Sequence, residues 1–177
     1  MLKNLFFTQF NKKFKPNRTK VDWISRDEKQ VDLFQEDPLR IEDFSLSIFL
    51  DILKGSKKVN SATTFLNTPK NLSIFIFSGD QDPVGEMGKG VSKVAAKYRR
   101  AAIQDLTLKL YKGGRHEMLN ELNKIEVEKD LLNWLQQTFI YNLAPGELGS
   151  CLLFVFVKPL PRIYKRFNPR RKLISNS

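Results

Sequence analysis

The sequence predicts an α/β fold built around a mostly parallel sheet, and three observations support this prediction. A nearly continuous apolar run of β-branched and aromatic residues occupies positions 72–77, between Pro69 and Gly79, and such a run is typical of a strand buried on both faces. Residues 106–111 alternate apolar and polar side chains, as a second strand does. Helical periodicity separates these strands and returns after them, which is typical of a doubly wound fold.

Length and composition fit one packed domain or part of a larger one. The 177 residues include 41% hydrophobic side chains and 14 Phe, which favours a packed region over disorder. The longest apolar run, residues 151–157, is too short to cross a bilayer, and residues 1–10 lack the cleavage site of a secretory signal. Because a single Cys excludes an internal disulfide, we expect a cytoplasmic protein.

The net charge of +11 is concentrated at the two ends of the chain. Residues 1–20 hold six basic and no acidic side chains, residues 151–177 hold seven basic and no acidic ones, and the body between them is slightly acidic. A solvated, charged end is the simplest interpretation, although a basic end can also contact phosphate backbones or anionic lipid. Because no zinc-finger spacing or RNA-binding aromatic string accompanies this charge, the sequence does not favour nucleic acid as a partner.

The segment before Pro69 predicts two short helices and loops, in the manner of a cap over an active site. Residues 25–28 read as a capping box, in which the Ser25 hydroxyl accepts from the N–H of Glu28. The helix that follows is expected to end near Gln35, ahead of Pro38. A second amphipathic helix is expected before Gly55, which would end it. Its apolar positions are Phe44, Ile48, Phe49, Ile52 and Leu53.

Beyond Pro69 the pattern is strand, helix, strand, helix. The first helix is expected to end near Gln104, and the second to begin near Asn123 and bury Val127 and Trp134. Proline, glycine and a cluster of arginines mark the chain after Asn142. The expected organisation is a cap over residues 1–68, the core over 69–141, and a basic tail over 142–177.

Asp82 and His116 are the candidate catalytic residues, since each follows one of the two predicted strands. Ligands of doubly wound sheets bind at the carboxyl ends of strands. A carboxylate there can orient an imidazole, and histidine, which changes charge near neutral pH, can take a serine proton and return it to a leaving group. Asp80 competes for the role of the carboxylate, although its position favours a role in turning the loop. Asp82 can also be a simple turn residue, and His116 a structural one.

Other motifs are weaker. Residues 85–90 suggest a phosphate-binding loop but lack the first Gly and the final Ser or Thr of a Walker A motif. Ser92 follows one glycine, lacks the second glycine of a Gly-x-Ser-x-Gly elbow and falls within a predicted helix. With one His and one Cys, the chain offers no metal-ligand set, and we expect no metal and no cofactor.

Several stretches resemble the C-terminal half of the serine aminopeptidase S33 group of α/β-hydrolases, in its monoacylglycerol lipase and lysophospholipase branch. They are residues 78–90 and 109–121 around the candidate pair, and residues 14–19 and 22–27, which are similar to the cap of bacterial members. The resemblance implies a partial α/β-hydrolase fold, with a helical cap remnant followed by the C-terminal β-α-β-α of the core sheet. It also implies Asp82 as the triad acid, His116 as the triad base, and a lipid-like ester with an acyl chain as substrate.

The sequence departs from that family in three ways. It has no nucleophile elbow, residues 40–43 interrupt the cap pattern, and the segment after Asn142 has no counterpart in the family. We therefore expect a C-terminal fragment of a serine hydrolase, from a truncated or frame-shifted gene, that is inactive alone. Two alternatives remain: a non-catalytic half that docks onto a separate N-terminal chain, and a basic interaction protein that binds nucleic acid or anionic lipid.

Overall fold

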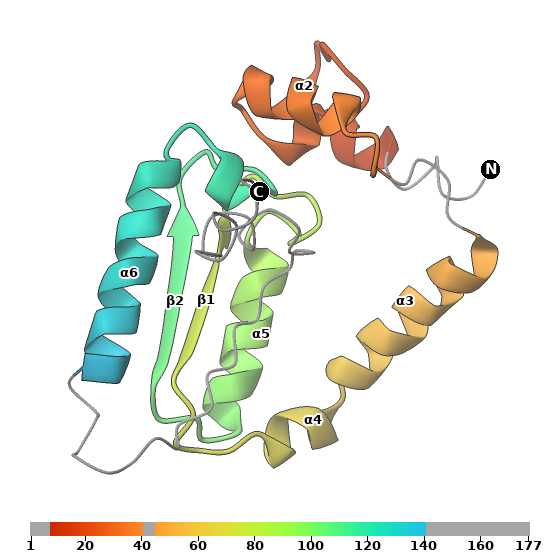
Figure 1. Ribbon diagram of the computed structural model, residues 1–177. Coiled ribbons are helices and arrows are strands. Elements are labelled where there is room, and N and C mark those ends of the chain that lie inside the picture. The colour runs from red at the N-terminus through yellow and green to blue at the C-terminus, as the bar shows by residue number, and fades with distance from the viewer. Residues whose placement is uncertain (1–7, 41–44, 141–177) are drawn as a thin grey trace, which may run out of the picture.

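Two parallel strands lie between two helices in the computed structural model, which describes residues 8–40 and 45–140. Strand β1 (Ile74–Gly79) pairs with β2 (Leu106–Tyr111) along its whole length. Helix α5 (Lys89–Arg100) covers one face of this sheet and α6 (Lys124–Ile140) covers the other (Figure 1). The predicted alternation of strands and helices and the parallel pairing are confirmed, although β1 begins two residues later than expected.

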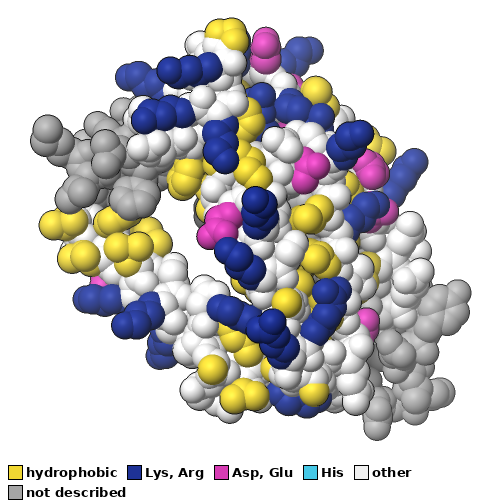
Figure 2. Space-filling view, turned by 180° about the vertical axis from the view of Figure 1, so that it is seen from behind, with side chains coloured by type: hydrophobic (Ala, Val, Ile, Leu, Met, Phe, Trp, Pro, Cys, Tyr) yellow, Lys and Arg dark blue, Asp and Glu magenta, His cyan; other side chains and the backbone are white. Residues whose placement is uncertain are grey.

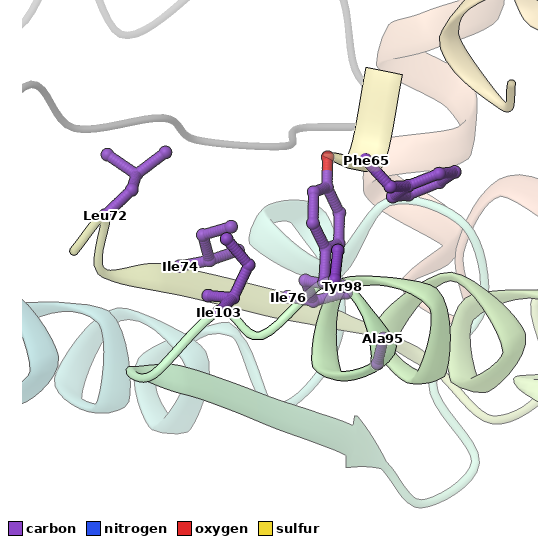
Figure 3. Packing of buried hydrophobic residues seen from close by; sticks show 8 residues of the cluster. Phe65, Leu72, Ile74, Ile76, Ala95, Tyr98 and Ile103 are labelled. Carbon is purple, nitrogen blue, oxygen red and sulfur yellow. The ribbon is translucent and has the colours of Figure 1, made fainter. Parts of the chain in front are cut away.

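The side chains of β1 are buried on both faces of the sheet, because successive residues of a strand point to opposite sides. Ile74 and Ile76 face α5, where they pack with Tyr98 in an apolar cluster (Figure 3). Phe75 lies on the other face, and its ring stacks on Trp134 of α6 with centroids 5.6 Å apart. Burial on both sides explains why this strand carries an unbroken apolar run rather than an alternating one.

Helix α5 ends at Arg100, earlier than the predicted end near Gln104. Ala102 adopts a left-handed backbone with φ of 62°, and the N–H of Ile103 bonds to the carbonyl of Tyr98 at 3.2 Å. This geometry turns the chain out of the helix. Glycine usually occupies such a position, and because alanine stands here the sequence carries no stop signal.

Residues 8–40 form short helical segments beyond the carboxyl ends of both strands (Figure 1). Residues 8–11 are helical, the turns η1 (Lys12–Phe14) and η2 (Asp22–Ile24) follow, and the longest helix is α2 (Glu28–Glu36). The helix end agrees with the prediction to within one residue. The segment therefore lies over the edge of the sheet where the candidate residues were expected.

The predicted capping box at Ser25 is wrong. The cap of helix α2 lies two residues later, at Asp27, whose carboxylate accepts from the N–H of Lys29 at 3.1 Å. The Ser25 hydroxyl instead accepts from the N–H of Asp27 at 3.0 Å and donates to the carbonyl of Asn120 at 2.7 Å. Ser25 thus joins this segment to a distant loop rather than closing a local cap.

Helix α3 (Leu46–Val59) runs through Gly55, so the predicted end at that glycine is also wrong. A glycine inside a helix weakens it by about 1 kcal/mol but does not terminate it. The short helix α4 (Ala62–Asn67), which no sequence pattern predicted, follows and leads into β1.

No residue of α3 is buried, and Figure 2 shows its apolar side chains exposed on the left of that view. Six of these side chains have exposed fractions between 44% and 61%. They are Leu46, Ile48, Leu50, Ile52, Leu53 and Val59. The apolar face of α3 is therefore not covered by the part of the chain that the structure describes.

The predicted basic tail, residues 142–177, and residues 1–7 lie outside the described ranges. The proposed boundaries after residues 68 and 141 stay predictions. Of the helices that are described, none combines the length and apolar content that a membrane crossing requires.

Candidate active site

The two candidate residues lie in loops that leave the same edge of the sheet. Both strands are parallel, so their carboxyl ends coincide, and Gly79 of β1 lies opposite Tyr111 of β2. Asp82 sits in a tight turn after β1, in which its N–H bonds to the carbonyl of Gly79 at 3.3 Å. His116 follows β2 after Gly113, whose left-handed backbone (φ 72°) turns the chain back toward β1.

The structure brings the side chains of Asp82 and His116 into contact. His116 Nδ1 lies 3.1 Å from Asp82 Oδ1 and 3.2 Å from Asp82 Oδ2. Because an ionised carboxylate only accepts hydrogen bonds, Nδ1 carries the hydrogen in this pair. The side chains are 5% exposed for the aspartate and 15% for the histidine, so little water competes for the bond. The N–H of Val84 donates to Asp82 Oδ1 at 2.9 Å and fixes the carboxylate.

The other ring nitrogen of His116, Nε2, differs from Nδ1 in its contacts. Among the described residues every hydrogen bond of this histidine goes through Nδ1, so Nε2 has no hydrogen-bond partner there. With the hydrogen on Nδ1, Nε2 holds a lone pair that can accept a proton. The arrangement therefore has the form of a general base oriented by a carboxylate.

Asp80, the competing carboxylate, has a different role. Its Oδ1 accepts from the backbone N–H of Gly113 at 2.8 Å and from the side chain of Gln81 at 3.1 Å. The first bond ties the turn after β1 to the loop that carries His116. Asp80 thus braces the loops, as its position in the sequence suggested, and Asp82 is the carboxylate in contact with the imidazole.

Ser92 lies inside α5, and its hydroxyl donates to the carbonyl of Gly88 one turn earlier at 2.9 Å. This hydroxyl is held by the helix backbone, which fits the structural role expected from the sequence. Within residues 8–40 and 45–140, no three His, Cys, Asp or Glu side chains gather as metal ligands would.

One member of the site escaped the sequence analysis. The ring of Trp23 packs against the ring of His116, with centroids 5.1 Å apart and planes inclined by 46°. Trp23 lies 93 positions earlier in the chain, and no local pattern announces such a contact. The available signal was the stretch 22–27, which resembled a cap but gave no indication that it touches the histidine.

A parallel β-α-β-α unit whose strand ends present a carboxylate and an imidazole in contact defines part of an α/β-hydrolase fold. A family model described as serine aminopeptidase, S33, matches residues 2–123. The chain belongs to this family.

Among solved structures, the chain is similar to a highly thermostable carboxyl esterase from Bacillus coagulans in complex with glycerol. The identity is 24% and the TM-score is 0.68, over 73% of this chain and 43% of the esterase. The chain thus spans less than half the length of that structure, and at this identity the likeness concerns the fold alone. A search of the curated proteins found no match.

Proposed function

We propose that Asp82 and His116 are the acid and base of a serine hydrolase that cleaves carboxylic esters. The observation that carries this proposal is the hydrogen bond from His116 Nδ1 to the Asp82 carboxylate, while Nε2 has no hydrogen-bond partner within residues 8–40 and 45–140. The proposed substrates are monoacylglycerols and lysophospholipids, the class implied by the resemblance of residues 78–90 and 109–121 to that branch of the family.

The chemistry that this pair performs is proton transfer. His116 Nε2 removes the proton of a serine hydroxyl as the oxygen attacks the ester carbonyl, and the Asp82 carboxylate stabilises the imidazolium that forms. The imidazolium then gives its proton to the departing alcohol as the acyl-serine forms. Water repeats the sequence, with His116 as base, and releases the fatty acid.

The serine in this proposal comes from polypeptide outside these 177 residues, because the sequence holds no Gly-x-Ser-x-Gly elbow. That polypeptide also supplies the backbone N–H groups that stabilise the oxyanion. Two features support the proposal that further polypeptide packs against this part of the fold. Among the described residues β1 pairs with β2 alone, and the apolar face of α3 is exposed. The partner is either a further segment of the same protein or a separate complementing chain.

Co-expression with a serine-bearing half tests the proposal. The partner is the part of an S33-family hydrolase that carries the nucleophile elbow, encoded either upstream of this chain or in a relative. Hydrolysis of a monoacylglycerol and of a lysophospholipid is measured, together with fluorophosphonate labelling of the elbow serine. We expect both signals from the pair of chains and neither from this chain alone.

Matched substitutions identify the groups responsible. Asp82→Asn and His116→Asn are each expected to lower kcat by about 10⁴-fold, the scale for triad members. Asp80→Asn removes a neighbouring carboxylate that does not contact the imidazole, and its kcat is expected to stay within a few-fold of the unsubstituted pair. Full activity of the His116→Asn pair would contradict the proposal, as would strong labelling of the isolated chain that disappears in Ser92→Ala.

A further inference from the structure

We propose that residues 22–26 form a positioning element for the His116 imidazole, and that Trp23 sets the orientation of the ring. A role of this element in catalysis rests on the proposed function, whereas its contacts with the histidine loop are observed directly. In this role, residues 22–26 hold the histidine in place as well as covering the site.

The residues on both sides of the histidine are anchored to this segment, Glu117 through its backbone and Arg115 through its side chain. The N–H of Glu117 donates to the carbonyl of Ile24 at 2.7 Å. The guanidinium of Arg115 donates to the carbonyl of Ser25 at 3.2 Å and also to the carbonyl of Asp22. The residues before and after the histidine are therefore tied to three carbonyls within residues 22–25, which restricts where the intervening side chain can point.

A buried carboxylate joins the two segments. The Glu121 side chain is fully buried, and it accepts from Arg26 Nε at 2.9 Å and from the N–H of Arg26 at 3.1 Å. The same carboxylate accepts from the N–H of Arg115 at 2.9 Å, inside the histidine loop. A buried charge with several donors fixes geometry because each donor lost leaves the charge uncompensated.

The aromatic contact acts on the ring itself. Trp23 is 7% exposed, packs on His116 at 5.1 Å, and is backed by Phe10 at 5.3 Å. The imidazole thus contacts both the Asp82 carboxylate and a buried indole. A half-turn of the imidazole about its Cβ–Cγ bond would exchange Nδ1 for a carbon beside the carboxylate, and the packed indole opposes this rotation. Trp23 thereby favours the orientation in which Nδ1 donates to the carboxylate and Nε2 keeps its lone pair.

His116 is the only histidine of the chain, so its ring can be observed without assignment ambiguity in the full 177-residue protein. Long-range ¹⁵N–¹H spectra report which ring nitrogen carries the hydrogen, and a downfield proton resonance reports the Nδ1–H bond. We expect the neutral ring to be mainly the Nδ1–H tautomer. In Trp23→Leu we expect the downfield resonance to disappear and the tautomers to mix as in a free imidazole.

The second tryptophan provides the matched control. Trp134 is equally buried, at 7% exposure, but it packs on Phe75 between α6 and the sheet. Trp134→Leu is expected to lower the melting temperature without changing the tautomer of His116, whereas Trp23→Phe, which keeps a ring at the contact, is expected to restore the Nδ1–H signal. If Trp23→Leu does not fold, Trp23→Met, which retains most of the volume without a ring, takes its place.

An unchanged tautomer and Nδ1–H resonance in a folded Trp23→Leu or Trp23→Met chain would overturn the inference. Loss of the signal in Trp134→Leu to the same extent would also overturn it, because the effect would then follow general loosening of the fold. These readouts need no serine and no substrate. Failure of the ester-hydrolysis assay with an intact tautomer effect would therefore reject the proposed function and leave the positioning role standing.

Discussion

A Cβ atom on Gly79 would lie 2.0 Å from the carbonyl oxygen of Gly114, so the end of β1 and the histidine loop meet backbone to backbone. The N–H of Gln81 donates to that same oxygen at 2.9 Å. Such an approach requires the absence of a side chain. This contact brings the turn that carries Asp82 and the loop that carries His116 to within hydrogen-bonding distance of each other.

Gly79→Ala is therefore expected to be strongly destabilising. The added methyl group meets backbone atoms, which cannot rotate away as a side chain can, so the two loops must separate. Overpacking of this kind costs about 3 kcal/mol. Chemical denaturation measures the loss, and the Nδ1–H resonance of His116 is expected to weaken with it.

Gly55→Ala is the control for this substitution. Its Cβ would meet nothing within 4 Å, and the position lies inside α3. Replacing a helical glycine by alanine is expected to raise helix stability by up to about 1 kcal/mol. Equal destabilisation by both substitutions would show that the close approach at Gly79 is not the cause.

The hydrogen bond from the N–H of Gly113 to Asp80 is expected to stabilise the two loops. Asp80→Ala leaves the N–H of Gly113 without its acceptor, at a cost of about 1–2 kcal/mol, while Asp80→Asn keeps an oxygen in place and costs less. Hydrogen exchange at the Gly113 amide measures the difference. We expect faster exchange in Asp80→Ala than in Asp80→Asn, and similar rates in both variants would assign the protection of this amide to another contact.

The core of this fold follows from local patterns, because an apolar run and an alternating run each have one simple explanation. Strand β2 is found at the residues where the alternation predicted it. The sequence also predicted that the loops carrying Asp82 and His116 lie near each other, because the residues that follow two parallel strands leave the sheet at the same edge. The contact between Asp82 and His116 needed only that topology and a short turn after each strand.

Features that depend on distant partners were not predictable. Ser25 and Asp27 are both good caps by type, and the choice between them is made by Asn120, which draws the Ser25 hydroxyl away. The position of Trp23 beside His116 depends likewise on the buried Glu121 carboxylate. Sequence periodicity reports which face of an element is buried, but it does not report which distant segment covers that face.

Acid pH is expected to loosen the positioning element through Asp22. Burial by itself raises the pKa of this carboxyl, but hydrogen bonds from the Thr19 hydroxyl and from the N–H groups of Thr19 and Arg18 outweigh it and hold the pKa below its ordinary value of 3.8. A carboxyl with a lowered folded-state pKa stabilises the fold above the unfolded value. That stabilisation is lost as the pH falls below 3.8.

Asp22→Asn tests this dependence. The neutral amide keeps one acceptor and loses the charge, which costs about 1.5 kcal/mol at neutral pH. The difference in stability between the unsubstituted chain and the variant is expected to be constant from neutral pH to about pH 5 and to shrink in more acid solution. A difference that grows on acidification would contradict the assignment.

Tyr111 ties β2 to α6 through Asp130. Its hydroxyl donates to Asp130 Oδ2 at 2.8 Å, and Lys109 binds the same oxygen. The tyrosine is 2% exposed. Burial, followed by the hydrogen bond to this carboxylate, raises the pKa of Tyr111 far above its ordinary value of 10.0. The neutral phenol is thus part of the interface between strand and helix.

The sign of the resulting pH dependence is opposite to that of Asp22. A group whose folded-state pKa is raised stabilises the fold fully below its unfolded value, and the contribution is lost as the pH rises above it. The unsubstituted chain is therefore expected to lose stability above pH 10.0 more steeply than Tyr111→Phe, which has no phenol to ionise. Tyr98→Phe serves as comparison, because burial alone raises the pKa of Tyr98. Replacing Tyr98 is expected to reduce the alkaline loss of stability less than replacing Tyr111 does. The measurement is the denaturation midpoint of each chain as a function of pH above 10.0. If the midpoints of the unsubstituted chain and of Tyr111→Phe fall in parallel, the phenol ionises as readily in the folded protein as in the unfolded one.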